Sequence, residues 1–231
     1  TGMRDNEGRK AQASFQRILA SGRHLLEVVN EILDFSKIEA GKMVVVQAPF
    51  VLGAAIDDAI GLTATAAYAK GLDVRVAEAA DLPERIIGDA MRLTQVLVNL
   101  LANAVKFTER GRVALAVARD GDTLVFCVSD SGIGIAPEQL GRLFQAFEQG
   151  DNSATRHFAG TGLGLAISKR LVEAMGGTLG VDSVPGAGTR FELRLPVPDL
   201  DSAPRLQLAR RAARIRLVGL AAEDCALLAA D

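Results

Sequence analysis

Three side chains suited to binding metal and phosphate share one face of a stretch with strong helical periodicity. Asn99, Asn103 and Lys106 lie opposite an apolar stripe within residues 89–107. Asparagine forms helices poorly, and a solvated face more often carries Glu, Lys or Ala. An amide oxygen can bind a hard cation such as magnesium, and an ammonium group can bind phosphate. The spacing therefore indicates a magnesium–phosphate site, with an ordinary solvated helix face as the alternative.

Asp130 lies where a predicted strand, residues 123–129, runs into a glycine turn. A carboxylate in this place can accept a hydrogen bond from an amine donor. Gly132 and Gly134 leave room for a flat ring, and Ile135 supplies an apolar wall. The pattern therefore indicates a site for a planar ligand with an amino group, and an ordinary Asp-Ser-Gly turn is the alternative.

A glycine-rich run precedes another apolar-periodic segment. The run has glycine at alternate positions and reads Gly160-Thr161-Gly162-Leu163-Gly164-Leu165. The segment after it is predicted to be a helix that stops at Gly176. Glycines let backbone amides approach a ligand closely, and a helix N-terminus presents unpaired N–H donors to phosphate. The run therefore favours phosphate binding, with a flexible turn before a surface helix as the alternative.

Two common nucleotide-binding motifs are excluded by the same residues. The dinucleotide fingerprint that begins at Gly132 would need a glycine at position 137, where the chain has Pro137. No Gly-x-x-x-x-Gly-Lys-Ser/Thr loop occurs in the sequence. A nucleotide bound by this chain must therefore be held by another architecture.

The bulk composition describes a globular chain with a real core. Of its 231 residues 49% are hydrophobic and 23% are charged, and the formal net charge of −2 argues against nucleic-acid binding. Cys127 and Cys225 are far apart and fit no metal-ligand spacing, which favours a reducing compartment. No apolar run is long enough to cross a bilayer. We expect a cytoplasmic chain, and a membrane anchor elsewhere in a longer protein remains open.

A long helix is predicted over residues 8–40, punctuated by Gly41. Its apolar residues recur at three- and four-residue steps, as in a coiled coil. We expect this seam to pack on a second helix or on a second copy of the chain, which would make a homodimer. The alternative is a helix laid on the domain that follows.

The pattern after Gly41 changes to alternating short elements. A β-branched run at residues 42–48 leads into an alanine-rich helix at 51–69, and Asp89 is expected to cap the helix that ends near residue 107. Strands are expected at residues 72–77, 85–87, 112–119, 123–129, 178–184 and 189–195. The predicted fold class is α+β. It is a two-layer α/β sandwich with a mixed, largely antiparallel sheet of about five strands and three helices, preceded by one long helix.

The sequence divides into three parts. Residues 1–42 hold the long helix and residues 43–197 the α+β domain. Prolines mark a linker after that domain, and residues 215–220 resemble the first strand of a further domain that is cut short. We therefore expect residues 198–231 to be a linker and the truncated start of another domain.

The ordered motifs together resemble the ATP-binding catalytic domain of sensor histidine kinases, which shares its fold with gyrase, Hsp90 and MutL. The resemblance rests on four sets of residues over about 150 positions: Asn99-x-x-x-Asn103-Ala104-x-Lys106-Phe107-Thr108, Asp130-x-Gly132-x-Gly134-Ile135, Phe144-x-x-Phe147 and Gly160-Thr161-Gly162-Leu163-Gly164-Leu165. Residues 23–42 resemble the second helix of the dimerisation hairpin of these kinases. The truncated C-terminal segment points to the hybrid type, with a receiver-like domain to follow.

The resemblance implies a role for each candidate residue. Asn103 would bind magnesium, with Asn99 beside it on the metal–phosphate group, and Lys106 would contact phosphate. Asp130 would bind the adenine amino group. The base would be lined by Gly132, Gly134 and Ile135.

The resemblance also implies an ATP lid over residues 148–162. Arg156 is a candidate ligand of the γ-phosphate. Phe144 and Phe147 would anchor the base of the lid, and plain core aromatics are the alternative for both. The residues that would close the lid onto the phosphates are Gly160, Thr161, Gly162, Leu163 and Gly164.

One position separates kinases from ATPases in this superfamily. The hydrolysing members carry a glutamate four residues before the metal-binding asparagine, and this chain has Asn99 there. An amide cannot take a proton from water, whereas a neutral imidazole acceptor already has a lone pair. The sequence therefore favours phosphoryl transfer to a histidine, with a conformational ATPase or a nucleotide-binding pseudokinase as alternatives.

The expected phosphoacceptor histidine is missing from this chain. His24 lies in the second-helix match and is not followed by an acidic residue, and His157 lies in the predicted lid. The acceptor is therefore expected on another helix, and the phosphoryl group is expected to pass to a response regulator or receiver domain. ATP and magnesium are the cofactors implied.

Overall fold

A computed structural model describes residues 2–148 and 161–197 of the chain. The residues form two compact units, 1–43 and 44–231, which are considered separately. Arg156, His157 and Gly160 lie outside the described residues, as does the predicted linker and receiver-like segment 198–231. Among the helices that the structure describes, none combines the length and the apolarity needed to cross a bilayer.

The first unit is a single helix, α1 (Gly2–Glu39). The turn after Glu39 stops the helix, since Gly41, with a φ of +63°, allows the amide of Lys42 to donate to Lys37 O at 2.9 Å. The predicted seam is present as large apolar side chains that are exposed within this chain, namely Phe15, Ile18, Leu19, Leu25, Leu26, Val29, Ile32 and Leu33. The long helix expected from the periodicity is therefore confirmed.

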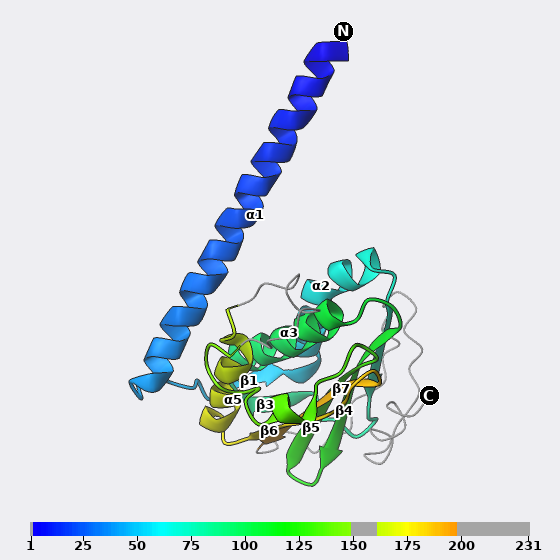
Figure 1. Cartoon of the computed structure of the whole chain (residues 1–231). Coiled ribbons are helices and arrows are strands. Elements are labelled where there is room, and N and C mark those ends of the chain that lie inside the picture. Colours follow the sequence, from blue (N-terminus) through cyan, green and yellow to red (C-terminus); the bar gives the residue numbers. More distant parts are fainter. Residues whose placement is uncertain (1, 149–160, 198–231) are drawn as a thin grey trace. The chain divides into compact units, whose positions relative to one another are not determined.

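The second unit is a mixed α/β layer structure (Figure 1). Its elements in chain order are β1 (Ala48–Val51), α2 (Leu52–Ala69), β2 (Asp73–Glu78), β3 (Arg85–Gly88), α3 (Ala90–Phe107), β4 (Arg112–Asp120), β5 (Thr123–Asp130), α4 (Pro137–Leu140), α5 (Gly164–Ala174), β6 (Thr178–Val184) and β7 (Gly188–Pro196). The predicted fold class is confirmed, and α4 is a short addition to the three expected helices.

Five strands form the main sheet in the order β2-β4-β5-β7-β6. β2 pairs with β4 in parallel, and the other neighbours are antiparallel. The antiparallel pairing of β4 with β5 confirms the hairpin signal at Asp120-Gly121-Asp122. The helices α2, α3 and α5 lie on one side of this sheet (Figure 1). The core between them contains fully buried side chains from both layers, including Leu97, Leu100, Leu115, Phe126 and Leu193.

A second, two-stranded sheet joins β1 and β3. The sequence pattern did not predict β1, and the β-branched run before it is not part of a strand. Val44 and Val46 are exposed, and the amide of Val46 donates to the side chain of Asp89 at 3.0 Å. Strand propensity is overridden here because that amide bonds to a side chain outside any ladder.

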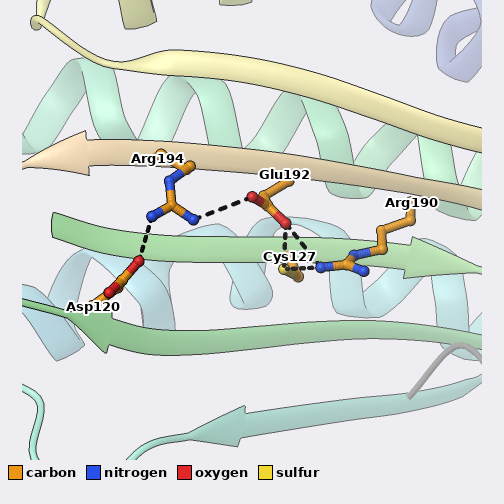
Figure 2. Close-up of polar contacts among 5 residues, drawn as sticks. All are labelled: Asp120, Cys127, Arg190, Glu192 and Arg194. Carbon is orange, nitrogen blue, oxygen red and sulfur yellow. Dashed lines mark hydrogen bonds and ion pairs between the residues drawn. The ribbon is translucent and has the colours of Figure 1, made fainter. Parts of the chain in front are cut away.

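The side of the main sheet away from the helices is called the outer face. The register places Ala116, Cys127 and Glu192 side by side on it, with Val125 and Arg194 in the next row. Figure 2 shows a chain of polar contacts along this face. Arg194 bonds to Asp120 and, at 3.4 Å, to Glu192. The Arg190 guanidinium donates to Glu192 at 2.8 Å and to the sulfur of Cys127 at 3.4 Å, so Asp120, Arg190, Glu192 and Arg194 are paired with one another.

Candidate functional site

Helix α3 carries the candidate metal and phosphate ligands, and its first turn is fixed by one carboxylate. The Asp89 side chain accepts a hydrogen bond from the Arg92 amide at 3.0 Å and another from the Val46 amide at 3.0 Å. Asp89 is 6% exposed, so both bonds compensate the burial of a charged group. The predicted N-cap is therefore confirmed, and the bond to Val46 is an addition that spacing alone does not predict.

The apolar face of α3 is buried against the sheet and α2, which leaves Asn99 and Asn103 on the opposite side. Asn99 Nδ2 donates to Ser168 Oγ at 2.8 Å, and Asn103 Nδ2 approaches Asn99 Oδ1 at 3.4 Å. Both asparagines thus use their amide nitrogens within the protein. Among the described residues none donates to the Asn103 side-chain oxygen, which leaves that oxygen for a ligand.

Lys106 lies in the last turn of the same helix. Its ammonium group lies 5.1 Å from the centroid of the Phe107 ring. Partial burial lowers the pKa of Lys106 because desolvation disfavours the charged form. An anion placed beside this group would favour the charged ammonium again.

Asp130 ends β5 and is held by backbone donors. Its carboxylate accepts hydrogen bonds from the amides of Gly132, at 2.8 Å, and Thr189. Burial raises the pKa of Asp130 from 3.8 to about 6, and the two backbone hydrogen bonds oppose that rise. The carboxylate is therefore a strong acceptor in a setting that offers its charge little compensation.

The loop after Asp130 passes very close to the end of α3. A β-carbon at Gly132 would lie 2.4 Å from the carbonyl oxygen of Phe107, so no larger residue fits there without a shift. The Ile133 amide donates to the same oxygen at 3.3 Å. The Ile135 amide donates to Ser183 Oγ at 2.8 Å, so β6 supports the far end of the loop.

Gly162 and Gly164 enter α5 beside the asparagine face. Gly162 has a φ of +72°, a conformation that favours glycine. A β-carbon at Gly164 would lie 2.6 Å from Asn99 Oδ1, so the glycine allows close packing of α5 on α3. Thr161 Oγ1 accepts a hydrogen bond from the Leu163 amide at 3.1 Å, and the Leu163 side chain is only 1% exposed. Any ligand contact of Leu163 would therefore come from its backbone.

The two phenylalanines of the third motif differ. Lys169 places its ammonium group 5.0 Å from the centroid of the Phe144 ring. Phe147 is 66% exposed, has a φ of +65° and donates its amide to Gly162 O at 3.2 Å. The core-aromatic alternative is therefore wrong for Phe147, whose strained backbone is held against the glycine run.

The structure brings the loop after Asp130 and the segment after the glycine run together around α3. Asn99 meets the α5 segment through Ser168, and Phe107 meets the loop that follows Asp130 through Ile133. Ser168 is 2% exposed and holds the Asn99 side chain, a contact that the sequence reasoning missed. Its signal was a hydroxyl on the buried face of an apolar helix. No comparable signal marked Ser183, whose hydroxyl accepts a hydrogen bond from the Ile135 amide of the loop from the separate strand β6.

The polar groups gathered here fit a nucleotide with a divalent cation. They include an amide oxygen without a protein donor, a lysine in the last turn of the same helix, and an uncompensated carboxylate beside a narrow loop. These groups suit a hard cation, phosphate and an amine-bearing ring, respectively.

Comparisons with known proteins identify the family of this domain. Residues 88–199 match the family described as histidine kinase-, DNA gyrase B-, and HSP90-like ATPase. The chain is 46% identical over 183 residues to the sensor protein GacS of Pseudomonas syringae pv. syringae, covering 77% of this chain and 20% of GacS. It is 40% identical over 191 residues to the signal transduction histidine-protein kinase BarA of Escherichia coli K12, covering 80% of this chain and 20% of BarA.

A solved structure is similar as well. The crystal structure of full-length ShkA in complex with AMPPNP matches with a TM-score of 0.70 and 39% sequence identity, covering 80% of this chain and 38% of ShkA. The chain spans about a fifth of the length of the two curated relatives above.

Proposed function

This chain belongs to the sensor histidine kinases and carries their ATPase-type catalytic domain, and we propose that it binds ATP with magnesium and transfers the γ-phosphoryl group to a histidine on a helical hairpin. The acceptor histidine would lie on a helix that this chain does not contain. From there the phosphoryl group would pass to a response regulator or receiver domain.

One observation carries the choice of transfer over hydrolysis. The Asn99 side chain donates through Nδ2 to Ser168 Oγ, at 2.8 Å, and an amide at this place has no basic atom with which to deprotonate water. A neutral imidazole needs no such base, because its lone pair can attack phosphorus directly. The geometry therefore supports a kinase better than an efficient ATPase.

The proposed roles follow from the contacts. Asn103, with Asn99 beside it, would hold the cation through amide oxygen, and Lys106 would contact phosphate. Bound magnesium would neutralise charge on the phosphates. Asp130 would accept a hydrogen bond from the adenine amino group, and the loop Gly132–Ile135 would line the base.

The glycine run would close over the phosphates. Thr161, Gly162 and Gly164 would place backbone amides there and exclude water from the transferring group. Arg156, which lies outside the described residues, is proposed as a ligand of the γ-phosphate.

The exposed apolar seam of α1 supports a homodimer as part of this proposal. Side chains such as Leu25, Leu26 and Leu33 are half or more exposed within one chain, which favours a second helix along them. We further propose that residues 1–42 are the second helix of the dimerisation hairpin and that residues 43–197 are the catalytic domain. Residues 198–231 would be a linker and the start of a receiver-like domain, in a region of the protein that faces the cytoplasm.

The binding step is tested by titration calorimetry of the chain with ATP, with and without magnesium. Asn103→Asp should abolish productive binding, because a charged carboxylate replaces a neutral amide beside the phosphates. Asn30→Asp makes the same chemical change at an exposed position of α1 and should leave the affinity unchanged. Equal affinity for wild type and Asn103→Asp would overturn the assigned role of Asn103.

The transfer step is tested with ATP labelled in the γ-phosphate and an added helix that carries a histidine followed by an acidic residue. Acid-labile, base-stable label on that helix is the expected result. ATP binding without label would favour a nucleotide-binding signalling module. Rapid release of inorganic phosphate without label would favour a conformational ATPase.

A further inference from the structure

Helix α2 ends in a motif that places its cap residue, Lys70, against the end of α3. Gly71 has a φ of +68°, and the Leu72 amide donates to Ala67 O at 3.1 Å, which closes the last turn. The Lys70 side chain reaches across to α3, a helix that begins twenty positions further along the chain. The contact is therefore tertiary and is not part of the local capping of α2.

The Lys70 ammonium group donates to three backbone carbonyls at the carboxyl end of α3. The distances are 2.7 Å to Val105 O, 2.9 Å to Lys106 O and 3.2 Å to Thr108 O. Val105 is 5% exposed and Thr108 is fully buried, so two of the three acceptors belong to buried residues, and the bond to Lys106 O is exposed. An ammonium group has three N–H donors, and a positive charge is favourable at a helix C-terminus.

The remaining carbonyls of this turn are also bonded. Ala104 O accepts from the Thr108 amide at 3.1 Å and from the Thr108 hydroxyl at 2.7 Å. Phe107 O accepts from the Ile133 amide at 3.3 Å. A helix leaves its last four carbonyls without intrahelical partners. Here Thr108, Lys70 and the loop after Asp130 supply those partners between them.

We propose that Lys70 is a positioning residue of the nucleotide site, an inference that rests on the proposed ATP-binding function. By holding the carbonyls of Val105, Lys106 and Thr108, Lys70 fixes the turn from which the Lys106 side chain extends toward phosphate. The same turn supports the loop that lines the base. Lys70 thereby sets the spacing between the groups that would bind the phosphates and those that would bind the base.

Phe107 connects the turn that Lys70 holds to the loop that would line the base. Phe107 O, which lies between the carbonyls that Lys70 holds, bonds to the Ile133 amide and would be 2.4 Å from a β-carbon at Gly132. The Gly132 amide in turn donates to Asp130 Oδ1 at 2.8 Å. With contacts this close, a shift of the turn by a few tenths of an ångström displaces Gly132 and Asp130 as well.

Lysine suits this position better than arginine does. Three carbonyls converge on one small cation, whereas a planar guanidinium directs its donors outward in a fixed fork. Lys70→Arg keeps the charge and the helix-dipole interaction but cannot reproduce the three bonds to one nitrogen. This substitution therefore separates simple charge stabilisation from positioning.

The test compares Lys70→Met, Lys70→Arg and the matched control Lys42→Met, which changes an exposed lysine after α1. Magnesium–ATP affinity is measured by calorimetry, and folding by thermal unfolding of the same samples. We expect about a tenfold loss of affinity for Lys70→Met, since bonds to a charged group are lost. Lys70→Arg should recover thermal stability but only part of the affinity, and Lys42→Met should match the wild type.

A double-mutant cycle with Lys106→Ala distinguishes positioning from general destabilisation. If Lys70 acts through Lys106, Lys70→Met should cost clearly less affinity when Lys106 is already alanine. Amide hydrogen exchange should also show faster exchange at Ile133 in Lys70→Met. Should Lys70→Met fail to fold, the affinity and exchange of Lys70→Arg carry the test.

Affinity within twofold of wild type for both Lys70 variants would overturn the inference, as would strict additivity with Lys106→Ala together with unchanged exchange at Ile133. These outcomes are distinct from failure of the proposed function. If the proposed function is wrong, the wild-type chain itself would bind no magnesium–ATP, whatever residue stands at position 70.

Discussion

The edge proposed to bind nucleotide, formed by α3, the loop after Asp130 and the start of α5, is called the nucleotide edge. It and the outer face of the sheet both carry polar groups, and they differ in where those groups find partners. On the outer face Asp120 pairs with Arg194, and Glu192 pairs with Arg190 and Arg194 (Figure 2). At the nucleotide edge Asp130 accepts only backbone amides among the described residues. The carboxylates of the outer face are thus ion-paired, whereas that of Asp130 is held by backbone amides.

The difference shows how a binding group can be recognised in an otherwise ordinary sheet. Carboxylates with cationic neighbours, such as Glu192, already have their charge compensated by the protein. Burial without a cation raises the pKa of Asp130 to about 6, so a ligand donor can still stabilise its charged form. We therefore expect changes at the nucleotide edge to alter binding and changes on the outer face to alter little.

The largest effect is expected from Asp130→Asn. The new side chain can keep its oxygen on the Gly132 amide. Its N–H group would then face the adenine amino group, so that two hydrogen-bond donors would oppose each other. ATP affinity should fall by about a hundredfold, measured by calorimetry. Glu192→Gln removes a charge from the outer face and should stay within twofold of wild type. Equal losses of ATP affinity for the two variants would contradict the proposed difference between the two faces.

Alanine substitutions at glycines on the two faces should differ in stability. At Gly132 the added β-carbon would lie 2.4 Å from Phe107 O, and we expect the free energy of unfolding to fall by about 1–3 kcal/mol. Gly180 lies opposite Glu192 in the register, and nothing lies within 4 Å of its β-carbon position. Gly180→Ala should therefore be neutral or stabilising by up to about 1 kcal/mol. Urea denaturation of both variants gives the comparison.

The pH dependence of ATP binding should report the ionisation of Asp130. Because the ligand binds the carboxylate form, affinity should rise about tenfold between pH 5 and pH 7, around the pKa of about 6. ATP has its own titrating phosphate, so the wild-type profile is divided by that of Asp130→Asn. A flat ratio would show that the ionisation of Asp130 does not govern binding.

The same pKa fixes the sign of the contribution of Asp130 to stability. Its folded-state pKa of about 6 is above the ordinary value of 3.8, so the folded chain holds this proton more tightly. The contribution of Asp130 to stability is therefore lost as pH rises from about 4 to above 6. Bound ATP should reduce this loss, because it favours the ionised form.

The smallest effect is expected from Arg194→Ala on the outer face. Its side chain is 40% exposed, and an exposed ion pair contributes little. The free energy of unfolding should change by at most about 0.5 kcal/mol, with ATP affinity unchanged. A large loss of ATP affinity would mean that the outer face is energetically coupled to the nucleotide edge.

Local features of the fold could be predicted from the sequence. The periodicity of α3, its cap at Asp89 and the β4–β5 hairpin all depend on neighbouring residues, and each is confirmed. The strand β1 could not be predicted, because it has only four residues and forms against β3, more than thirty positions away. Tertiary pairing, not propensity, creates that strand.

In the candidate site, too, local features could be predicted from the sequence, whereas tertiary contacts could not. The face shared by Asn99, Asn103 and Lys106 follows from helical geometry. The hydrogen bond from Asn99 to Ser168 and the reach of Lys70 to α3 join residues 69 and 35 or more positions apart, and no spacing rule encodes them. The roles assigned to the ligands stay predictions until nucleotide binding is measured.

The hydrogen bond from Val46 to Asp89 has a consequence for where the folding unit begins. Similarity to the ATPase family starts at residue 88, yet the carboxylate that caps α3 needs an amide from residue 46. Leu52 and Ile56 of α2 are fully buried as well. A polypeptide trimmed to the matched segment would keep the Arg92 cap bond but lose the second hydrogen bond to the Asp89 carboxylate and one wall of the core. The smallest piece that can be expected to fold therefore starts near Val44, where the compact unit starts.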